Sequence, residues 1–223
     1  MLSARIFQKG LGVRWTFMTE FIQTTVDLIR HGEPEGGVKF RCSLDDPLSE
    51  SGWQQMDKVL APAPDWDLVV SSPLQRCSAF AEAFASQRSI ECEVEPCFRE
   101  LGFGQWEGLT IDEVTGSDFR TLSNFWRDPI NNTPPGAESL EFFRDRVLVG
   151  WRALLERHAG KHLLLVVHGA VIRVMLHDVL QVPLNHVFRL EVAFACLSRV
   201  RVDGLGSDAV PNLVFHGGSL DKA

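Results

Sequence analysis

Two stretches that lie far apart in the chain each place a histidine and a glycine directly after a buried-strand pattern. The first is Thr25–Ile29, which runs into Arg30-His31-Gly32, and the second is Leu163–Val167, which runs into His168-Gly169. Short apolar runs of this kind are typical of parallel strands that are covered on both faces. Ligands of open α/β sheets bind beside the carboxyl ends of such strands. We therefore expect both histidines at one ligand site on one edge of a sheet.

Strand and helix patterns alternate along the rest of the chain. This alternation predicts an α/β fold, a three-layer α/β/α sandwich with a mostly parallel central sheet. Four further strands are expected, at Asp67–Val70, Cys92–Val94, Ala195–Val202 and Asn212–Phe215. The spacing of apolar residues predicts helices at 49–60, from 73 onward, at 139–158 and at 170–180, with a helical insertion at 111–135. The sequence has no repeat and no interdomain linker, so we expect one domain over 18–223.

The segment Ser71–Arg76 has the pattern of a helix start. Ser72 is expected as the N-cap, Pro73 as the first helical residue, and Gln75 as the partner in a capping box. Arg76 would then lie in the first helical turn, again at the carboxyl edge of a strand.

The composition limits the partners and the compartment. The formal net charge of −7 argues against a general nucleic-acid or membrane-surface binder, although a local cationic pocket remains compatible with it. The five cysteines are an odd number without a CxxC pair, which indicates a reducing cytoplasm rather than a disulfide framework. No apolar run approaches the roughly 18 residues of a membrane span. We expect a cytoplasmic protein, and the sequence does not indicate its oligomeric state.

Residues 1–17 contain three basic residues and no acidic one. One interpretation is an organellar targeting peptide, and the other is an upstream extension with Met18 as the functional first residue. We expect the second, with 1–17 as a poorly ordered extension.

The residues at the strand ends are suited to binding a phosphate. Arg30 and Arg76 supply fork-shaped donors that match phosphate oxygens, and the helix starts after Ser72 and Gly169 offer backbone N–H groups. Gly32 and Gly169 allow the backbone to approach a ligand closely.

A phosphate held in this way faces a histidine that can act as a nucleophile through a neutral ring nitrogen. His31 is the expected nucleophile, and His168 is expected to donate to the transferring phosphoryl group. Glu100 opens a glycine- and aromatic-rich loop at 98–108 and is the expected proton donor to the leaving alcohol, with Glu107 and Glu33 as rivals.

Four blocks of the sequence resemble, in order, the signature blocks of the histidine phosphatase (phosphoglycerate mutase-like) superfamily. They are Leu28–Glu33, Ser71–Arg76, Arg99–Gly108 and Val167–Arg173. The resemblance spans about 26–202. It implies a phosphorylated nucleophile at His31, a phosphate pocket of Arg30, Arg76 and His168, a proton donor at Glu100, a small phosphorylated substrate, and no metal or other cofactor.

Three further segments are similar to bacterial α-ribazole phosphatases: Leu44–Gly52, Phe103–Gly108 and Pro135–Ser139. This similarity implies hydrolysis of α-ribazole 5′-phosphate in cobalamin synthesis. The alternatives are a histidine phosphatase of a sugar phosphate or a phosphohistidine protein, a mutase, and a non-catalytic phosphate-binding module.

The chain departs from many superfamily members after Arg-His-Gly-Glu, where they carry an asparagine. Pro34–Gly37 occupies this place here, and glycine N–H groups, Lys39 or Arg41 are the candidates to replace the asparagine. Trp106, Phe125 and Trp126 are expected in the core, with an apolar wall for an aromatic base as the alternative. Arg173 is expected to be structural.

Overall fold

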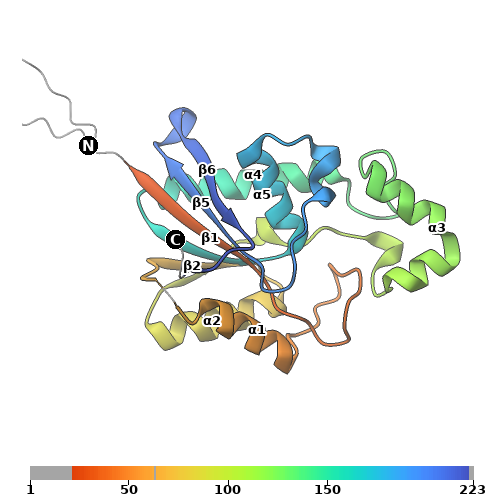
Figure 1. Cartoon of the computed structure of the whole chain (residues 1–223), viewed down its shortest axis with the longest axis horizontal. Coiled ribbons are helices and arrows are strands. Elements are labelled where there is room, and N and C mark those ends of the chain that lie inside the picture. The colour runs from red at the N-terminus through yellow and green to blue at the C-terminus, as the bar shows by residue number, and fades with distance from the viewer. Residues whose placement is uncertain (1–21, 63, 221–223) are drawn as a thin grey trace, which may run out of the picture.

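A six-stranded sheet runs through the part of the chain that the computed structural model describes, residues 22–62 and 64–220 (Figure 1). Its strands are β1 (Gln23–Arg30), β2 (Leu68–Ser71), β3 (Cys92–Val94), β4 (His162–Val167), β5 (Leu197–Asp203) and β6 (Val210–His216). Their order is β3-β2-β4-β1-β5-β6. The first four strands are parallel, and β5 and β6 are antiparallel additions at one edge. The predicted mostly parallel sheet is confirmed. The expected extension at 1–17 lies outside the described residues.

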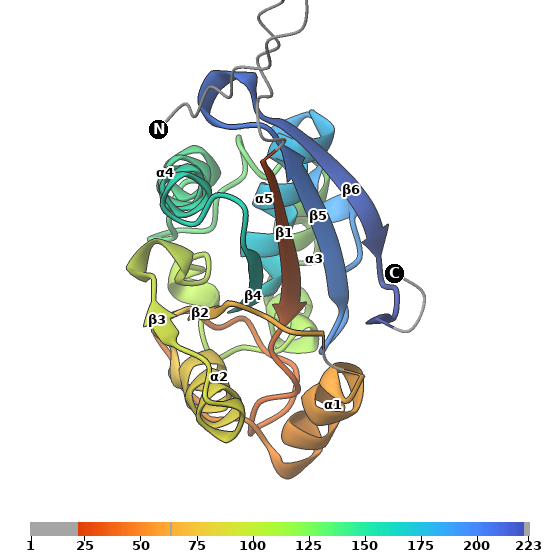
Figure 2. The same cartoon turned by 90° about the vertical axis from the view of Figure 1, so that its left-hand side faces the viewer.

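Helices cover both faces of this sheet, as Figure 2 shows. They are α1 (Glu50–Leu60) and α2 (Gln75–Arg88) on one face and α4 (Leu140–Arg157) and α5 (Gly169–Leu180) on the other, while α3 (Ile111–Arg127) stands apart from the sheet in Figure 1. Successive residues of a strand point to opposite faces of the sheet. Leu28 therefore packs in the core under α4 and α5, while Ile29 packs in the core under α1 and α2. This arrangement is the predicted three-layer sandwich. No helix within the described residues is both long and apolar enough to cross a membrane.

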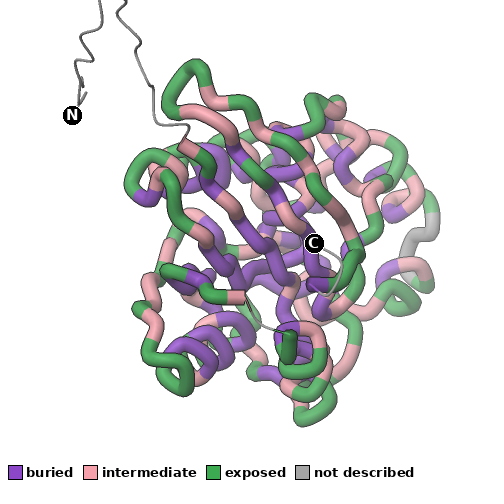
Figure 3. Tube along the Cα trace, turned by 60° about the vertical axis from the view of Figure 1, so that its left-hand side comes forward, coloured by how far each residue is buried: buried purple, intermediate pink, exposed green. Residues whose placement is uncertain are grey.

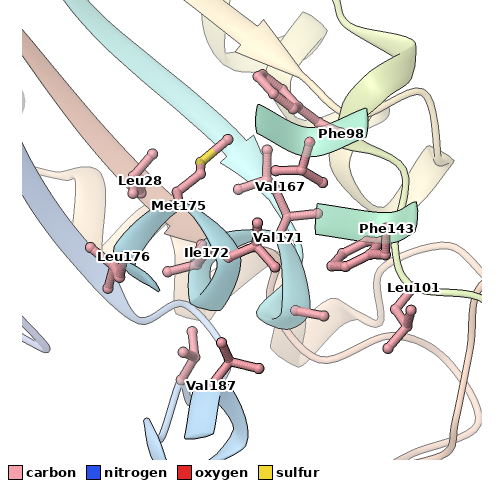
Figure 4. Close-up of a cluster of buried hydrophobic side chains, with 14 of the residues drawn as sticks. Leu28, Phe98, Leu101, Phe143, Val167, Val171, Ile172, Met175, Leu176 and Val187 are labelled. Atoms are coloured by element: carbon pink, nitrogen blue, oxygen red, sulfur yellow. The ribbon is translucent and has the colours of Figure 1, made fainter. Parts of the chain in front are cut away.

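Strand β4 lies in the middle of the molecule and is buried throughout its apolar run, Leu163–Val167. Figure 3 shows the buried segments concentrated in the sheet and the inner faces of the helices. Figure 4 shows how Val171, Ile172 and Met175 of α5 pack beside Leu28 and Val167. A helix that is fixed so tightly at its start holds its first residues in place relative to the strand ends.

The register of β1 and β4 sets the position of the two histidines. Arg30 is paired with Val167, and the N–H of His31 donates to the carbonyl of Val167 at 2.9 Å. The two strands therefore end level with each other, and His31 and His168 leave the sheet side by side.

The start of α2 differs from the prediction. The helix begins at Gln75, its N-cap residue is Leu74, and that residue makes no side-chain cap. The N–H of Gln75 is instead bound by Asp45 Oδ1 at 2.7 Å, from a loop 30 residues earlier. The prediction of Ser72 as N-cap was wrong because a distant carboxylate caps the helix and the Ser72 hydroxyl contacts another side chain.

Candidate active site

A cavity of about 240 Å³ lies at the carboxyl edge of the sheet, beyond β1 and β4. Five of the residues singled out from the sequence line it: Arg30, His31, Arg76, Glu100 and Gly169. His168 lies directly beside it, since its ring centroid is 5.2 Å from that of His31. The structure thus brings together residues from four separate segments of the chain.

His31 is 4% exposed and is held by its own turn. Its Nδ1 lies 2.7 Å from the carbonyl oxygen of Gly32, so Nδ1–H donates to that oxygen and the lone pair of the neutral ring is on Nε2. Burial lowers the pKa of His31 well below its usual value, and the charges of Arg30 and Arg76 lower it further. At neutral pH His31 is therefore uncharged, the form in which an imidazole is nucleophilic.

Gly32 allows the turn after β1 to touch the first turn of α1. A Cβ at Gly32 would lie 2.1 Å from the carbonyl oxygen of Gly52, and a Cβ at Gly52 would lie 2.1 Å from that of Glu33. The glycine after His31 is therefore required by backbone contact, in addition to any approach of a ligand.

His168 is 0% exposed, and its Nε2 lies 2.7 Å from the hydroxyl oxygen of Ser72. Burial lowers the pKa of His168 well below its usual value, and the Arg76 charge contributes to this lowering. His168 is also neutral at neutral pH.

Each of the two arginines uses one N–H group in a hydrogen bond within the protein and keeps another, on Nε, without an acceptor among the described residues. Arg30 Nη1 donates to the carbonyl of Val192 at 2.6 Å, and Arg76 Nη1 donates to that of Leu44 at 3.1 Å. The Nε of each is buried without a hydrogen-bond partner among the described residues. Burial lowers the pKa of Arg30 to about 10, so it remains charged at neutral pH. Unsatisfied, charged donors in a cavity favour an anionic ligand.

Glu100 reaches the cavity from the loop after β3. Its Oε1 accepts from the N–H of Leu101 at 3.0 Å, and its Oε2 accepts from the N–H of Ala170 at 3.4 Å. Its rivals Glu107 and Glu33 do not line the cavity. Glu107 instead binds the N–H of Ser43 and the N–H of Phe103.

Arg146 of α4, which sequence reasoning missed, fixes the backbone on which Glu100 sits. Its guanidinium donates to the carbonyls of Arg99 and Glu100 at 2.8 and 3.0 Å and pairs with Glu138 at 2.7 Å. The thiol of Cys42 donates to the Glu100 carbonyl as well. No sequence motif indicates this role, which becomes visible only where the fold brings Arg146 against the distant loop.

The helix N-termini are used differently from the expectation. The N–H of Ala170 is bound by Glu100, and that of Gln75 is bound by Asp45. Both donors therefore serve contacts within the protein.

Arg173 lies on the cavity wall, one turn into α5. Its Nε donates to the carbonyl of Leu190 at 2.8 Å. A Cβ at Gly169 would lie 2.9 Å from its Nη1 and 3.4 Å from Arg30 Nε, so Gly169 leaves room for both guanidiniums.

The loop that follows Gly32 supplies further cations. Lys39 and Arg41 both line the cavity, and Arg41 is anchored by Asp46 at 2.6 Å and by the carbonyls of Gly37 and Glu35. Arg41 therefore braces its own loop, whereas Lys39 lies exposed on the rim.

An apolar wall faces these charges. Trp126 is 40% exposed and lines the cavity with Phe188 and Phe194, while Trp106 and Phe125 are buried in the core as expected. The Arg30 guanidinium lies 4.2 Å from the ring centroid of Phe194. Sequence reasoning missed Phe188 and Phe194, because they lie in a 3-10 turn and a loop without a periodic pattern.

Comparison with known proteins shows relatives of similar sequence, including the following two. The chain is 32% identical over 192 residues to a bifunctional protein of Mycobacterium tuberculosis, a match that covers 84% of this chain and 52% of that protein. It is 30% identical over 160 residues to the phosphatase PhoE of Bacillus subtilis, covering 70% of this chain and 77% of that protein. The chain spans about half the length of the mycobacterial relative.

Solved structures share the fold. YhfR of Bacillus stearothermophilus superposes with a TM-score of 0.77 at 28% identity and covers 87% of this chain and 96% of its own. A mycobacterial glucosyl-3-phosphoglycerate phosphatase gives 0.76 at 23% identity, covering 88% and 100%. An Escherichia coli protein assigned as an α-ribazole-5′-phosphate phosphatase gives 0.74 at 22%, covering 87% and 96%.

The family model described as the histidine phosphatase superfamily (branch 1) matches residues 26–210, which include all four sequence blocks. This match confirms the superfamily that the blocks predicted. The chain belongs to the histidine phosphatase superfamily.

Proposed function

We propose that the protein hydrolyses a phosphomonoester through a phosphohistidine at His31. The observation that carries this proposal is a neutral His31, with its Nε2 lone pair free, in a cavity lined by Arg30 and Arg76. Arg30, Arg76 and His168 hold the phosphoryl group and neutralise its charge in the transition state.

The reaction has two steps. Nε2 of His31 attacks phosphorus, the bond to the alcohol oxygen breaks, and Glu100 gives that oxygen its proton. Water then attacks the phosphohistidine, the Glu100 carboxylate takes the proton from the water, and inorganic phosphate leaves. The guanidiniums supply the positive charge that the phosphoryl group needs, so we propose that no metal takes part.

The proposed substrate is α-ribazole 5′-phosphate, which would place the protein late in cobalamin synthesis. The exposed Trp126, together with Phe188, supports an aromatic leaving group, because an aromatic base gains area and stacking contacts there. The E. coli protein of similar fold bears the same assignment. A sugar phosphate offers fewer apolar groups to this wall and is the second candidate.

Hydrolysis of p-nitrophenyl phosphate in the presence of EDTA tests the reaction. The wild-type protein is expected to release phosphate. The rate of release by His31→Ala is expected to be lower by roughly 10³-fold or more, since no other group replaces the nucleophile. A labelled phosphoryl group that is lost in acid and retained in alkali, and that is found on the wild-type protein but not on His31→Ala, would support the phosphohistidine. Binding of phosphate without any hydrolysis would identify the protein as a non-catalytic binding module. Transfer of the phosphoryl group to 3-phosphoglycerate, in place of its release as phosphate, would identify it as a mutase.

A panel of phosphomonoesters tests the substrate. We expect the highest kcat/KM for α-ribazole 5′-phosphate. We expect Trp126→Ala to lower this kcat/KM by about 5-fold and to leave that for glycerol phosphate unaffected, since one aromatic contact contributes about 1 kcal/mol. Similarly low kcat/KM values for all esters in the panel would contradict the proposed role in cobalamin synthesis.

A further inference from the structure

The hydroxyl of Ser72 departs from its local sequence signal. The Ser-Pro-x-Gln pattern favours an N-cap at Ser72, yet α2 starts at Gln75 and Asp45 binds the N–H of Gln75. The Ser72 oxygen still accepts from the N–H of Leu74, but it does not cap the first turn of α2, and its proton is left for a second contact.

That second contact is with His168, 96 residues later in the chain. The Ser72 oxygen lies 2.7 Å from His168 Nε2, and both residues are 0% exposed. A hydrogen bond that is shielded from water in this way fixes the orientation of the ring more firmly than an exposed one does.

The groups around Ser72 favour one direction for this hydrogen bond. The N–H of Leu74 already donates to the Ser72 oxygen at 3.3 Å. A hydroxyl has one proton to give, and Nε2 of His168 is the acceptor within reach of it among the described residues. With Ser72 as the donor, a neutral His168 carries its proton on Nδ1, and the weakly polar sulfur of Cys77 lies 3.7 Å from both ring nitrogens.

We propose that Ser72 is a positioning residue for His168. Its hydroxyl donates to Nε2, holds the ring beside His31, and keeps the ring proton on Nδ1, so that an N–H remains free to donate to the transferring phosphoryl group. This inference rests on the proposed function, in which His168 stabilises that group. The reversed bond, with Nε2–H donating to Ser72, would leave a neutral His168 with no proton for the phosphoryl oxygen.

Ser71 provides a matched control. It is 0% exposed like Ser72, and its hydroxyl donates to the backbone carbonyl of Ser72 at 2.8 Å instead of to His168. Ser71→Ala therefore removes a buried hydroxyl of the same kind from the adjacent position, and it reports what the loss of such a group does to the fold alone.

Kinetics of Ser72→Ala give the first test. By analogy with residues that orient metal ligands, kcat is expected to fall about 10- to 100-fold, with KM within about threefold of wild type. Ser71→Ala is expected to keep kcat within about threefold, and Ser72→Thr, which keeps the hydroxyl, is expected to restore most of the rate. Equal losses in Ser71→Ala and Ser72→Ala would overturn the proposal.

A double-mutant cycle gives the second test. In a His168→Ala background, Ser72→Ala is expected to change kcat by less than about twofold, because the group it positions is gone. A full 10- to 100-fold loss in that background would assign Ser72 a role independent of His168 and would overturn the proposal.

The ring nitrogens of His168 report the tautomer directly. In ¹⁵N-labelled protein we expect a protonated Nδ1 and an unprotonated Nε2, with the Nε2 signal moved in Ser72→Ala and unmoved in Ser71→Ala. A protonated Nε2 in neutral wild-type His168 would overturn the proposal. This readout needs no substrate, so it stands apart from the fate of the proposed reaction, which fails if the wild-type protein hydrolyses no phosphomonoester.

Discussion

At the scale of single residues, the site depends on two histidines that burial keeps neutral. His31 and His168 have pKa values well below the usual one, and in both cases burial is the first cause and nearby guanidiniums add to it. The same guanidiniums that attract an anion thereby keep the proposed nucleophile unprotonated. The guanidiniums proposed to hold the phosphoryl group therefore add to burial in favouring the neutral form of His31.

Stability should fall as the pH is lowered from about 6.5, because the unfolded chain takes up protons on His31 and His168 that the folded protein does not. The sign follows from a folded pKa below the unfolded one, so the contribution is complete above pH 6.5 and decreases below it. Urea denaturation between pH 7.5 and 5 measures the slope. His31→Asn is expected to flatten it, and an unchanged slope in that variant would show that His31 titrates normally in the fold.

Glu100→Gln should lower kcat for hydrolysis by a factor that depends on the leaving group. An amide cannot donate the proton that an alkyl alcohol needs, so kcat for an alkyl phosphate is expected to fall about 10²- to 10⁴-fold. p-Nitrophenolate leaves without much help, so its ester should lose far less. Paired assays of the two esters check this, with Glu107→Gln as the control, and equal losses on both esters would speak against proton donation.

At the scale of elements, the site depends on the close contact between the turn after β1 and the start of α1. Gly32 and Gly52 face each other there with no room for a methyl group on either. Ser49 begins α1, as predicted, and its hydroxyl accepts from the N–H of Gly52 at 3.0 Å and donates to the carbonyl of Glu33 at 2.9 Å. The helix start is thereby attached to the segment that carries His31.

Gly→Ala substitutions in two helices should have opposite effects. Gly52→Ala is expected to destabilise by about 1–3 kcal/mol, because its Cβ would meet the backbone of Glu33. Gly116 of α3 has open space around its Cβ position, so Gly116→Ala is expected to stabilise by roughly 0.5–1 kcal/mol. Chemical denaturation of both variants measures the difference, and a stable Gly52→Ala protein would show that the contact can relax.

At the scale of the whole molecule, a buried carboxylate inside the sheet joins β1 to side chains from three other segments. Asp27 of β1 is 0% exposed and accepts hydrogen bonds from Trp66, His162 and Arg199, which precede β2 or belong to β4 and β5. Burial alone would raise the pKa of Asp27, but the bonds from His162 and Arg199 outweigh it and lower the pKa. The carboxylate form is thus part of the fold.

Asp27→Asn should destabilise the protein by about 3–5 kcal/mol, since it removes the buried carboxylate that pairs with the half-buried Arg199. The kcat of any remaining folded protein should be nearly unchanged, because Asp27 does not line the cavity. Urea denaturation and the p-nitrophenyl phosphate assay measure the two effects. Asp145→Asn, at an exposed pair with Arg144, is the control that should change neither.

The sequence by itself determined the layers of the fold, the helix starts at Ser49 and Ser139, and five of the residues that line the cavity. Each of these depends on apolar spacing, caps or motifs that span a few neighbouring residues. Only the tertiary structure decided that Asp45 caps α2, that Ser72 contacts His168, that Arg146 holds the Glu100 loop, and that Phe188 and Phe194 complete the cavity wall. These contacts join residues that are tens of positions apart. A polar or aromatic side chain fits several partners equally well in sequence, and the packed core alone selects which partner comes within reach.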